Sequence, residues 1–122
     1  PYVIPVNYGY EDGFIYIHSA REGRKLEMIR GNKKVCFAVH VDAEIYERGD
    51  KACQWGTTYR SVIGFGDAYI TRNFEQKKHA LDVIMKHYSD ARSFEYHESA
   101  VENVVVIRVE ISEMTGKKSS EE

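Results

Sequence analysis

A predicted β-strand ends, and a predicted helix begins, within the stretch His18-Ser19-Ala20-Arg21-Glu22-Gly23-Arg24-Lys25. A strand-to-helix junction offers unpaired backbone N–H groups and the positive end of a helix dipole, and both attract phosphate. Gly23 allows the backbone to approach an anion closely, Arg24 can hold phosphate oxygens with its planar guanidinium, and Lys25 adds a point charge. The stretch therefore predicts a phosphate-binding turn.

The same stretch also fits a purely structural role. Ser19 and Glu22 have the spacing of a capping box, and the basic residues fit a solvated helix face. His18 could deliver a proton to a bound substrate, but a single histidine is often a hydrogen-bonded structural residue. Spacing alone leaves both interpretations open.

Arg60 and Ser61 form a second candidate site within a long predicted strand, shortly before Gly64 and Gly66. The two glycines would let the strand bend. The guanidinium and the hydroxyl could then contact the polar chain of a ligand. Equally, Arg60 could pair with an acidic side chain while Ser61 faces solvent.

The rest of the chain predicts a mainly β protein. Apolar alternation bounded by turn residues predicts strands, and 3.6-residue periodicity predicts helices. The predicted strands cover residues 2–8, 14–18, 34–41, 54–71 and 103–113, and the predicted helices cover residues 23–30 and 73–88. This number of strands, with so few helices, favours a small antiparallel barrel.

Local signals mark the ends of these elements. Residues 9–13 supply turn chemistry and predict a hairpin between the first two strands, although Pro5 cannot donate to a strand ladder. Asn73, with Gln76 at the capping-box position, begins the longer helix. The apolar stripe expected on that helix consists of Leu81, Ile84, Met85 and Tyr88.

Length and composition limit the class of protein. The 122 residues suffice for one domain with its own core, and 43% hydrophobic with 30% charged residues indicates a globular chain. A net charge of −2 argues against a generic nucleic-acid-binding protein. No apolar run is long enough to span a membrane, so no membrane partner is expected. Residues 116–122 are polar and predict a flexible tail after a single domain at residues 1–115.

Cysteine and histidine positions argue against several kinds of site. Cys36 and Cys53 are too few for a disulfide framework or a four-thiolate metal site, and they fit free thiols in the reducing cytoplasm. The histidines lack metal-ligand spacing, so no metal site is expected. The sequence also lacks the glycine pattern of a Rossmann cofactor site and the Gly-x-Ser-x-Gly nucleophile elbow.

Several segments, read together, match one known pattern. They are residues 1–8, 10–13, 18–25, 32–37 and 59–62, followed by the closing apolar strand, and they span nearly the whole chain. In this combination the chain resembles the FMN-binding split barrels related to pyridoxamine 5′-phosphate oxidase, and within them the nitroimidazole-resistance branch. The resemblance implies a homodimer of six-stranded antiparallel split β-barrels, with FMN in clefts at the dimer interface.

The resemblance also implies roles for single residues. Gly23, Arg24 and Lys25 match the phosphate-binding turn, and His18 matches a histidine associated with the active site in the nitroimidazole-resistance branch. Pro5, Val6 and Asn7 match the strand whose backbone passes the isoalloxazine ring. His18, Ser19 and Ala20 match the stretch beside that ring. Ser61, with Arg60, matches the position that the flavin reaches from the other subunit.

Two family features are missing from the sequence. Members usually begin with a helix and a strand ahead of the segment that matches residues 1–8, so such a region is expected to precede Pro1. The Arg-rich closing segment of true pyridoxamine phosphate oxidases is also absent, so a vitamin B6 phosphate is not the expected substrate.

The leading hypothesis is an FMN-dependent oxidoreductase that passes electrons to a small-molecule acceptor such as a nitroaromatic compound. Arg24, Lys25 and the Gly23 amide would hold the phosphate, Ser61 the phosphate or ribityl chain, and His18 would deliver a proton. The alternative is a flavin- or haem-binding sensor, carrier or scavenger without efficient turnover. A third hypothesis, an oligonucleotide-binding barrel that stacks bases on aromatic rings, is disfavoured by the net charge.

Overall fold

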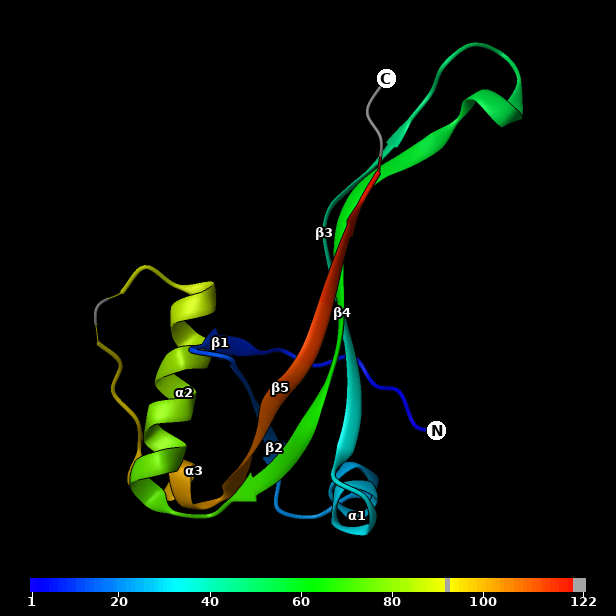
Figure 1. Cartoon of the computed structure of the whole chain (residues 1–122). Coiled ribbons are helices and arrows are strands. Elements are labelled where there is room, and N and C mark those ends of the chain that lie inside the picture. The colour runs from blue at the N-terminus through cyan, green and yellow to red at the C-terminus, as the bar shows by residue number, and fades with distance from the viewer. Residues whose placement is uncertain (92, 120–122) are drawn as a thin grey trace. The chain divides into compact units, whose positions relative to one another are not determined.

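The computed structural model describes residues 1–91 and 93–119, and strands make up most of its regular structure (Figure 1). The strands are β1 (Gly9–Glu11), β2 (Phe14–Ala20), β3 (Lys34–Tyr46), β4 (Gly56–Thr71) and β5 (Val104–Lys118). The helices are α1 (Arg24–Gly31), α2 (Phe74–Tyr88) and α3 (Glu98–Glu102), with a short 3₁₀ turn at Ala52–Gln54.

The strands form one sheet in the order β1-β2-β5-β4-β3. β1 pairs antiparallel with β2, and β2 pairs antiparallel with β5 from Phe14 opposite Glu110 to Ala20 opposite Val104. The prediction of a mainly β chain with antiparallel pairing is confirmed. The described part of the chain contains five strands, so the sixth strand of the expected barrel stays a prediction.

The predicted strand at residues 2–8 is wrong. The chain has no regular structure before Gly9, and β1 is only three residues long. Asp12 and Gly13, with φ angles of 50° and 87°, make the two-residue turn of a tight hairpin, which places Glu11 opposite Phe14. The ladder ends at Gly9 opposite Tyr16, and Pro5 lacks the N–H group that could help to extend it.

β3 and β5 extend further than the sequence predicts. β3 continues to Tyr46, and β5 continues to Lys118, through the start of the segment that was expected to be a tail. Just after β5, the Ser119 N–H group donates to the Tyr59 carbonyl at 3.0 Å. Such pairing needs only main-chain groups, so a polar sequence can follow a strand ladder. The remaining tail residues, 120–122, lie outside the described residues.

α2 begins where the sequence predicts but buries a different face. The Gln76 N–H group donates to the Asn73 side chain at 3.0 Å, which confirms the predicted N-cap. The buried positions of the helix are Lys77, Ala80, Val83 and Ile84. Of the predicted stripe only Ile84 is buried, whereas Met85 and Tyr88 are exposed. α2 lies very close to β1 and β2, and its Ala80, Val83 and Ile84 share a core with Tyr16 and Val106 (Figure 1).

The residues of the chain group into two compact units. The first unit consists of Pro1–Val35 and Gly66–Ile111, and it contains all three helices and the core around α2. The second unit consists of Cys36–Phe65 and Ser112–Glu122. Among the described residues of this second unit, Gly64 alone is buried. Its exposed large hydrophobic residues are Val41, Ile45, Trp55, Ile63, Phe65 and Met114.

The close approach of β1 to α2 predicts a strong effect at Gly9. A Cβ atom at this position would lie 2.6 Å from backbone atoms of Val83 and Ile84. Because main-chain atoms of a packed helix cannot move aside freely, Gly9→Ala should lower the free energy of unfolding by about 2 kcal/mol in urea denaturation. Gly31→Ala is the matched control, since a Cβ there has no neighbour within 4 Å. Equal stability of the two variants would contradict the close packing.

Candidate functional site

The turn between β2 and α1 leads into a helix whose N-terminus no side chain caps. Gly23 is the N-cap of α1 and has a φ angle of 146°, which L side chains rarely adopt. No side chain caps the helix, so the N–H groups of its first turn remain available to a ligand. The capping-box interpretation of Ser19 with Glu22 is therefore wrong. The Ser19 hydroxyl donates instead to the Ala20 carbonyl at 3.0 Å.

Arg24 and Lys25 bring two positive charges to the first turn of α1. The next residue, Leu26, is fully buried and anchors the helix in the core. Arg24 is exposed and Lys25 is half-buried. Within residues 1–91 and 93–119, neither side chain forms an ion pair with a carboxylate. Both charges are therefore available to an anion at the helix N-terminus, where the helix dipole also favours negative charge.

Pro5, Val6 and Asn7 lie on an exposed stretch of chain without regular structure. The stretch is held at its start by Arg24, whose guanidinium carbon lies 5.2 Å from the centroid of the Tyr2 ring. This contact brings the predicted ring-binding segment and the predicted phosphate turn into the same part of the first unit.

Tyr8 holds the other end of that stretch. Its N–H group donates to the Tyr88 hydroxyl at 3.1 Å, and its ring lies 4.6 Å from the ring of His87. Burial raises the pKa of the Tyr8 phenol, and the neighbouring Tyr88 raises it further, so the phenol is neutral at pH 7. Residues 5–7 therefore lie between the two contacts made by Tyr2 and Tyr8, and their side chains are exposed.

His18, Ser19 and Ala20 form the last three residues of β2. Side chains alternate along a strand, and accordingly His18 and Ala20 are exposed while Ser19 is buried. The imidazole of His18 is therefore accessible from solvent, just before the β2–α1 turn. Ser19 contributes packing and a local hydrogen bond and presents no free hydroxyl to a ligand.

Arg60 and Ser61 lie on β4, in the second unit. The Arg60 Nε atom donates to the Asp42 carboxylate at 2.9 Å, and its Nη2 atom contacts the same oxygen. Arg60 therefore pairs with an acid, as the structural alternative stated. Ser61 is half-buried, and its hydroxyl lies 3.5 Å from the Lys117 carbonyl, at the outer limit of hydrogen bonding. The other predicted residues all belong to the first unit.

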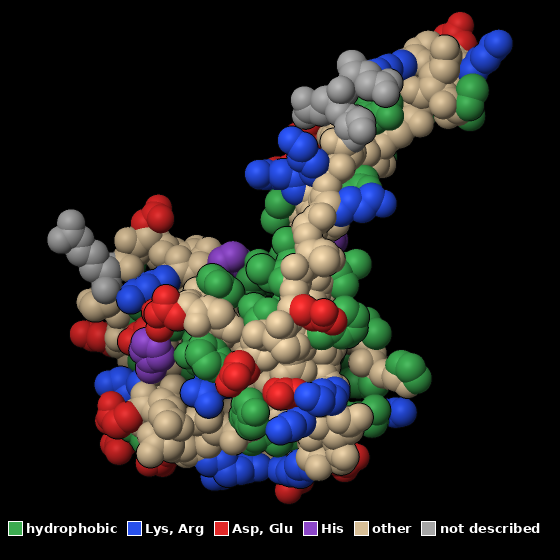
Figure 2. Space-filling view, in the orientation of Figure 1, with side chains coloured by type: hydrophobic (Ala, Val, Ile, Leu, Met, Phe, Trp, Pro, Cys, Tyr) green, Lys and Arg blue, Asp and Glu red, His purple; other side chains and the backbone are tan. Residues whose placement is uncertain are grey.

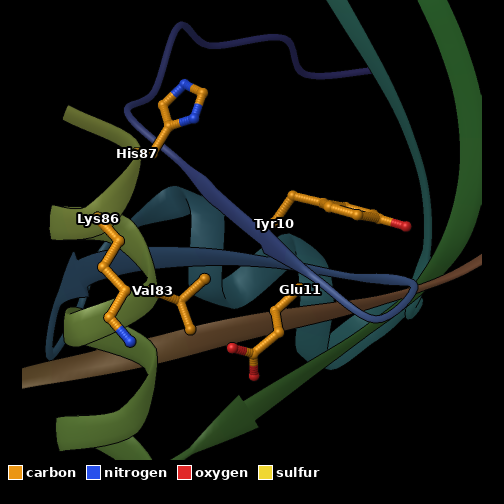
Figure 3. A pocket seen from close by; sticks show the side chains of 5 residues that line it. All are labelled: Tyr10, Glu11, Val83, Lys86 and His87. Atoms are coloured by element: carbon orange, nitrogen blue, oxygen red, sulfur yellow. The ribbon is translucent and has the colours of Figure 1, made fainter. Parts of the chain in front are cut away.

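Two of the hollows among the described residues lie in the first unit, and no predicted site residue lines either of these two. A hollow of about 270 Å³ lies between β1 and α2 (Figure 3), and a second of about 540 Å³ lies beside α3. Glu11, which lines the first hollow, also accepts a hydrogen bond from His79, with 2.7 Å between the His79 Nε2 and Glu11 Oε1 atoms. The lining residues are Tyr10, Glu11, Val83, Lys86 and His87 in the first, and Phe74, Lys78, Phe94, Glu95, Tyr96, Glu98 and Val101 in the second.

Sequence reasoning missed the residues that fix residues 5–7 in space. Tyr2 and Tyr8 fit the alternation of a strand, so the sequence predicts one shared strand face for them and not contacts with helices. Their partners, Arg24 and His87, are far away in sequence, and no local pattern indicates such contacts. The face of the molecule drawn in Figure 2 carries acidic and basic side chains interspersed.

Two kinds of feature are not found in the described ranges, 1–91 and 93–119. They contain no cluster of three or more His, Cys, Asp or Glu side chains that could hold a metal ion. They also contain no helix with the length and apolar character needed to cross a membrane.

Comparison with known proteins identifies relatives over almost the whole chain. The sequence profile of the family described as pyridoxamine 5′-phosphate oxidase matches residues 1–118. Comparison with curated proteins gives no match.

Solved structures add three informative similarities. A candidate 5-nitroimidazole antibiotic resistance protein from Bacteroides thetaiotaomicron is 37% identical with a TM-score of 0.80, over 95% of this chain and 68% of that protein. An FAD-binding protein from Mesorhizobium loti is 28% identical with a TM-score of 0.66, over 98% of this chain and 78% of that protein. The flavocytochrome Anf3 from Azotobacter vinelandii is 22% identical with a TM-score of 0.78, over 99% of this chain and 57% of that protein, and it shows the shared fold alone.

Proposed function

This chain belongs to the pyridoxamine 5′-phosphate oxidase family, and on that basis we propose that it is a homodimeric, FMN-dependent oxidoreductase acting on a small acceptor. The observation that carries the proposal is the β2–α1 turn, where an uncapped helix N-terminus, Arg24 and Lys25 meet. The FAD-binding relative supports a flavin cofactor. The nitroimidazole-resistance relative supports a nitroaromatic acceptor.

The described residues fit the phosphate of a flavin. The N–H groups after Gly23 would bind its oxygens, with Arg24 and Lys25 neutralising its charge. The exposed segment at residues 5–7 lies in the same unit and would pass beside the ring system. A bound flavin would supply the electron transfer between donor and acceptor, for which ordinary side chains have no equivalent.

His18 is the residue proposed to deliver a proton to the acceptor. Reduction of a nitro group consumes protons as well as electrons, so a proton donor near the ring accelerates it. The imidazole is exposed at the end of β2, and an imidazole can act as a general acid toward a bound substrate. The protein would otherwise bind the flavin, orient it and exclude water from its reactive face.

The second compact unit gives a physical reason for a dimer. Six large hydrophobic side chains are exposed on it, from Val41 to Met114, and a second copy of the chain would cover such a surface. A flavin resting on one chain would leave its ring in water, whereas flavin sites bury most of their ligand. In this proposal Ser61 of the partner subunit contacts the phosphate or the ribityl chain.

The first test is whether the purified protein carries a flavin and holds it at the β2–α1 turn. The visible spectrum, with the mass of the compound released on denaturation, should identify FMN rather than FAD or haem. Replacing Arg24 and Lys25 together with Ala should weaken FMN binding at least tenfold, about 1.4 kcal/mol, in a fluorescence titration, because charge-assisted phosphate contacts are lost.

A matched control removes the same charge from the other end of α1. Replacing Arg30 and Lys33 with Ala should leave FMN affinity within about twofold, since the helix dipole and the free N–H groups are not at that end. Equal loss in both double variants would mean that net charge, and not the turn, governs binding.

A mixing experiment tests the shared site. Chains with Arg24 and Lys25 replaced by Ala, and chains with Ser61→Asp, should each bind FMN poorly as homodimers. After the two are mixed and allowed to exchange subunits, each heterodimer should regain one intact site, because one turn and one Ser61 are unaltered and face each other. No recovery, with heterodimers shown by native mass spectrometry, would mean that each site belongs to a single chain.

Turnover of a nitroimidazole by the holoprotein, with a chemical reductant as the electron donor, tests the reaction. His18→Ala should lower the rate by about a hundredfold through loss of proton delivery, while FMN affinity stays within a few-fold. His40→Ala, which alters another exposed histidine, serves as the control. A wild-type holoprotein that turns over no acceptor would instead indicate a flavin carrier or sensor.

A further inference from the structure

Lys77 is a buried basic residue that the proposed site does not use. It lies on α2 and is only 5% exposed. Its Nζ atom donates to the Val104 carbonyl at 2.9 Å and to the Glu102 carbonyl at 3.4 Å. In the part of the chain that the structure describes, no carboxylate forms an ion pair with it. Main-chain carbonyls therefore hold this ammonium group.

Core packing alone does not explain a lysine at this position. Burial of an ammonium group is unfavourable unless hydrogen bonds replace its water, and a methionine would fill a similar volume without that penalty. The acceptors suggest the reason. Glu102 is the last residue of α3, whose terminal carbonyls have no helical partner, and Val104 is the first residue of β5. One ammonium has enough N–H donors to hold both carbonyls.

The start of β5 lies opposite the end of β2 that belongs to the proposed site. Val104 is in register with Ala20, Val105 with Ser19, and Val106 with His18. The position of β5 at its first residues therefore determines where the last residues of β2 lie. The β2–α1 turn follows directly from them.

We propose that Lys77 is a positioning residue for the cofactor site: its ammonium fixes the start of β5, and β5 in turn orients His18, Ser19 and Ala20. The cofactor part of this inference rests on the proposed function. The structural link from Lys77 through β5 to β2 does not, and the two can be measured separately.

The test compares Lys77→Met with Lys78→Met, which removes the neighbouring exposed lysine. Amide hydrogen exchange followed by NMR on the full chain should become about tenfold faster at Ser19, Ala20 and Val105 in Lys77→Met, while Gly9–Glu11 stays protected as in the wild type. FMN should bind about tenfold more weakly. Lys78→Met should show neither change, and Lys77→Arg, which keeps the donors, should restore both properties.

The outcomes separate the two hypotheses. Unchanged exchange at Ser19 and Ala20 overturns the inference, and so does equally faster exchange throughout β1 and β2, because that shows only a general loss of stability. If the wild type binds no FMN, the proposed function fails, yet the exchange pattern still decides the role of Lys77. If Lys77→Met does not fold, Lys77→Gln, which keeps one donor group, is held to the same exchange criteria.

Discussion

The antiparallel pairing of β2 with β5 is the contact on which the rest of the first unit depends. Val105, Val106, Ile107 and Val109 of β5 are almost completely buried, and this apolar run lies in register with β2. α2 packs on one face of the pair through Ala80, Val83 and Ile84. Because β2 is fixed along its whole length, its last residues and the following turn have a defined position. A loop that is held by a rigid strand is well suited to position binding residues.

Much of this fold follows from local sequence signals. The cap at Asn73, the helix beginning after Gly23 and the apolar closing strand could be predicted because each depends on neighbouring residues. The errors arise where distant segments decide the structure. Residues 2–8 alternate like a strand, but a strand needs a partner, and the contacts of Tyr2 and Tyr8 with helices replace one. The buried face of α2 likewise depends on how closely β1 approaches it.

In the candidate site, too, the features set by neighbouring residues could be predicted, and those set by distant segments could not. The β2–α1 turn could be predicted because its glycine, its charges and its helix N-terminus are consecutive in sequence. The ion pair between Arg60 and Asp42 could not be predicted, because the two residues lie on neighbouring strands of the sheet and are distant in sequence. Lys77 was equally hidden, since a lysine on a helix is expected in solvent and its acceptors are main-chain carbonyls. The family relationship is what connects these residues to a proposed cofactor site.

The two candidate arginines differ in which part of the guanidinium is already used. Two nitrogen atoms of Arg60, Nε and Nη2, contact the Asp42 carboxylate, so these N–H donors are not available to phosphate. Arg24 instead contacts the ring of Tyr2, with its guanidinium carbon 5.2 Å from the ring centroid. Among the described residues no carboxylate forms an ion pair with Arg24, so its N–H donors could bind phosphate oxygens. The contact with the Tyr2 ring also restricts the side chain before any ligand arrives, which lowers the entropy lost on binding. In the proposed site, Arg24 is therefore better suited than Arg60 to bind phosphate, and Tyr2 would help to hold it in place.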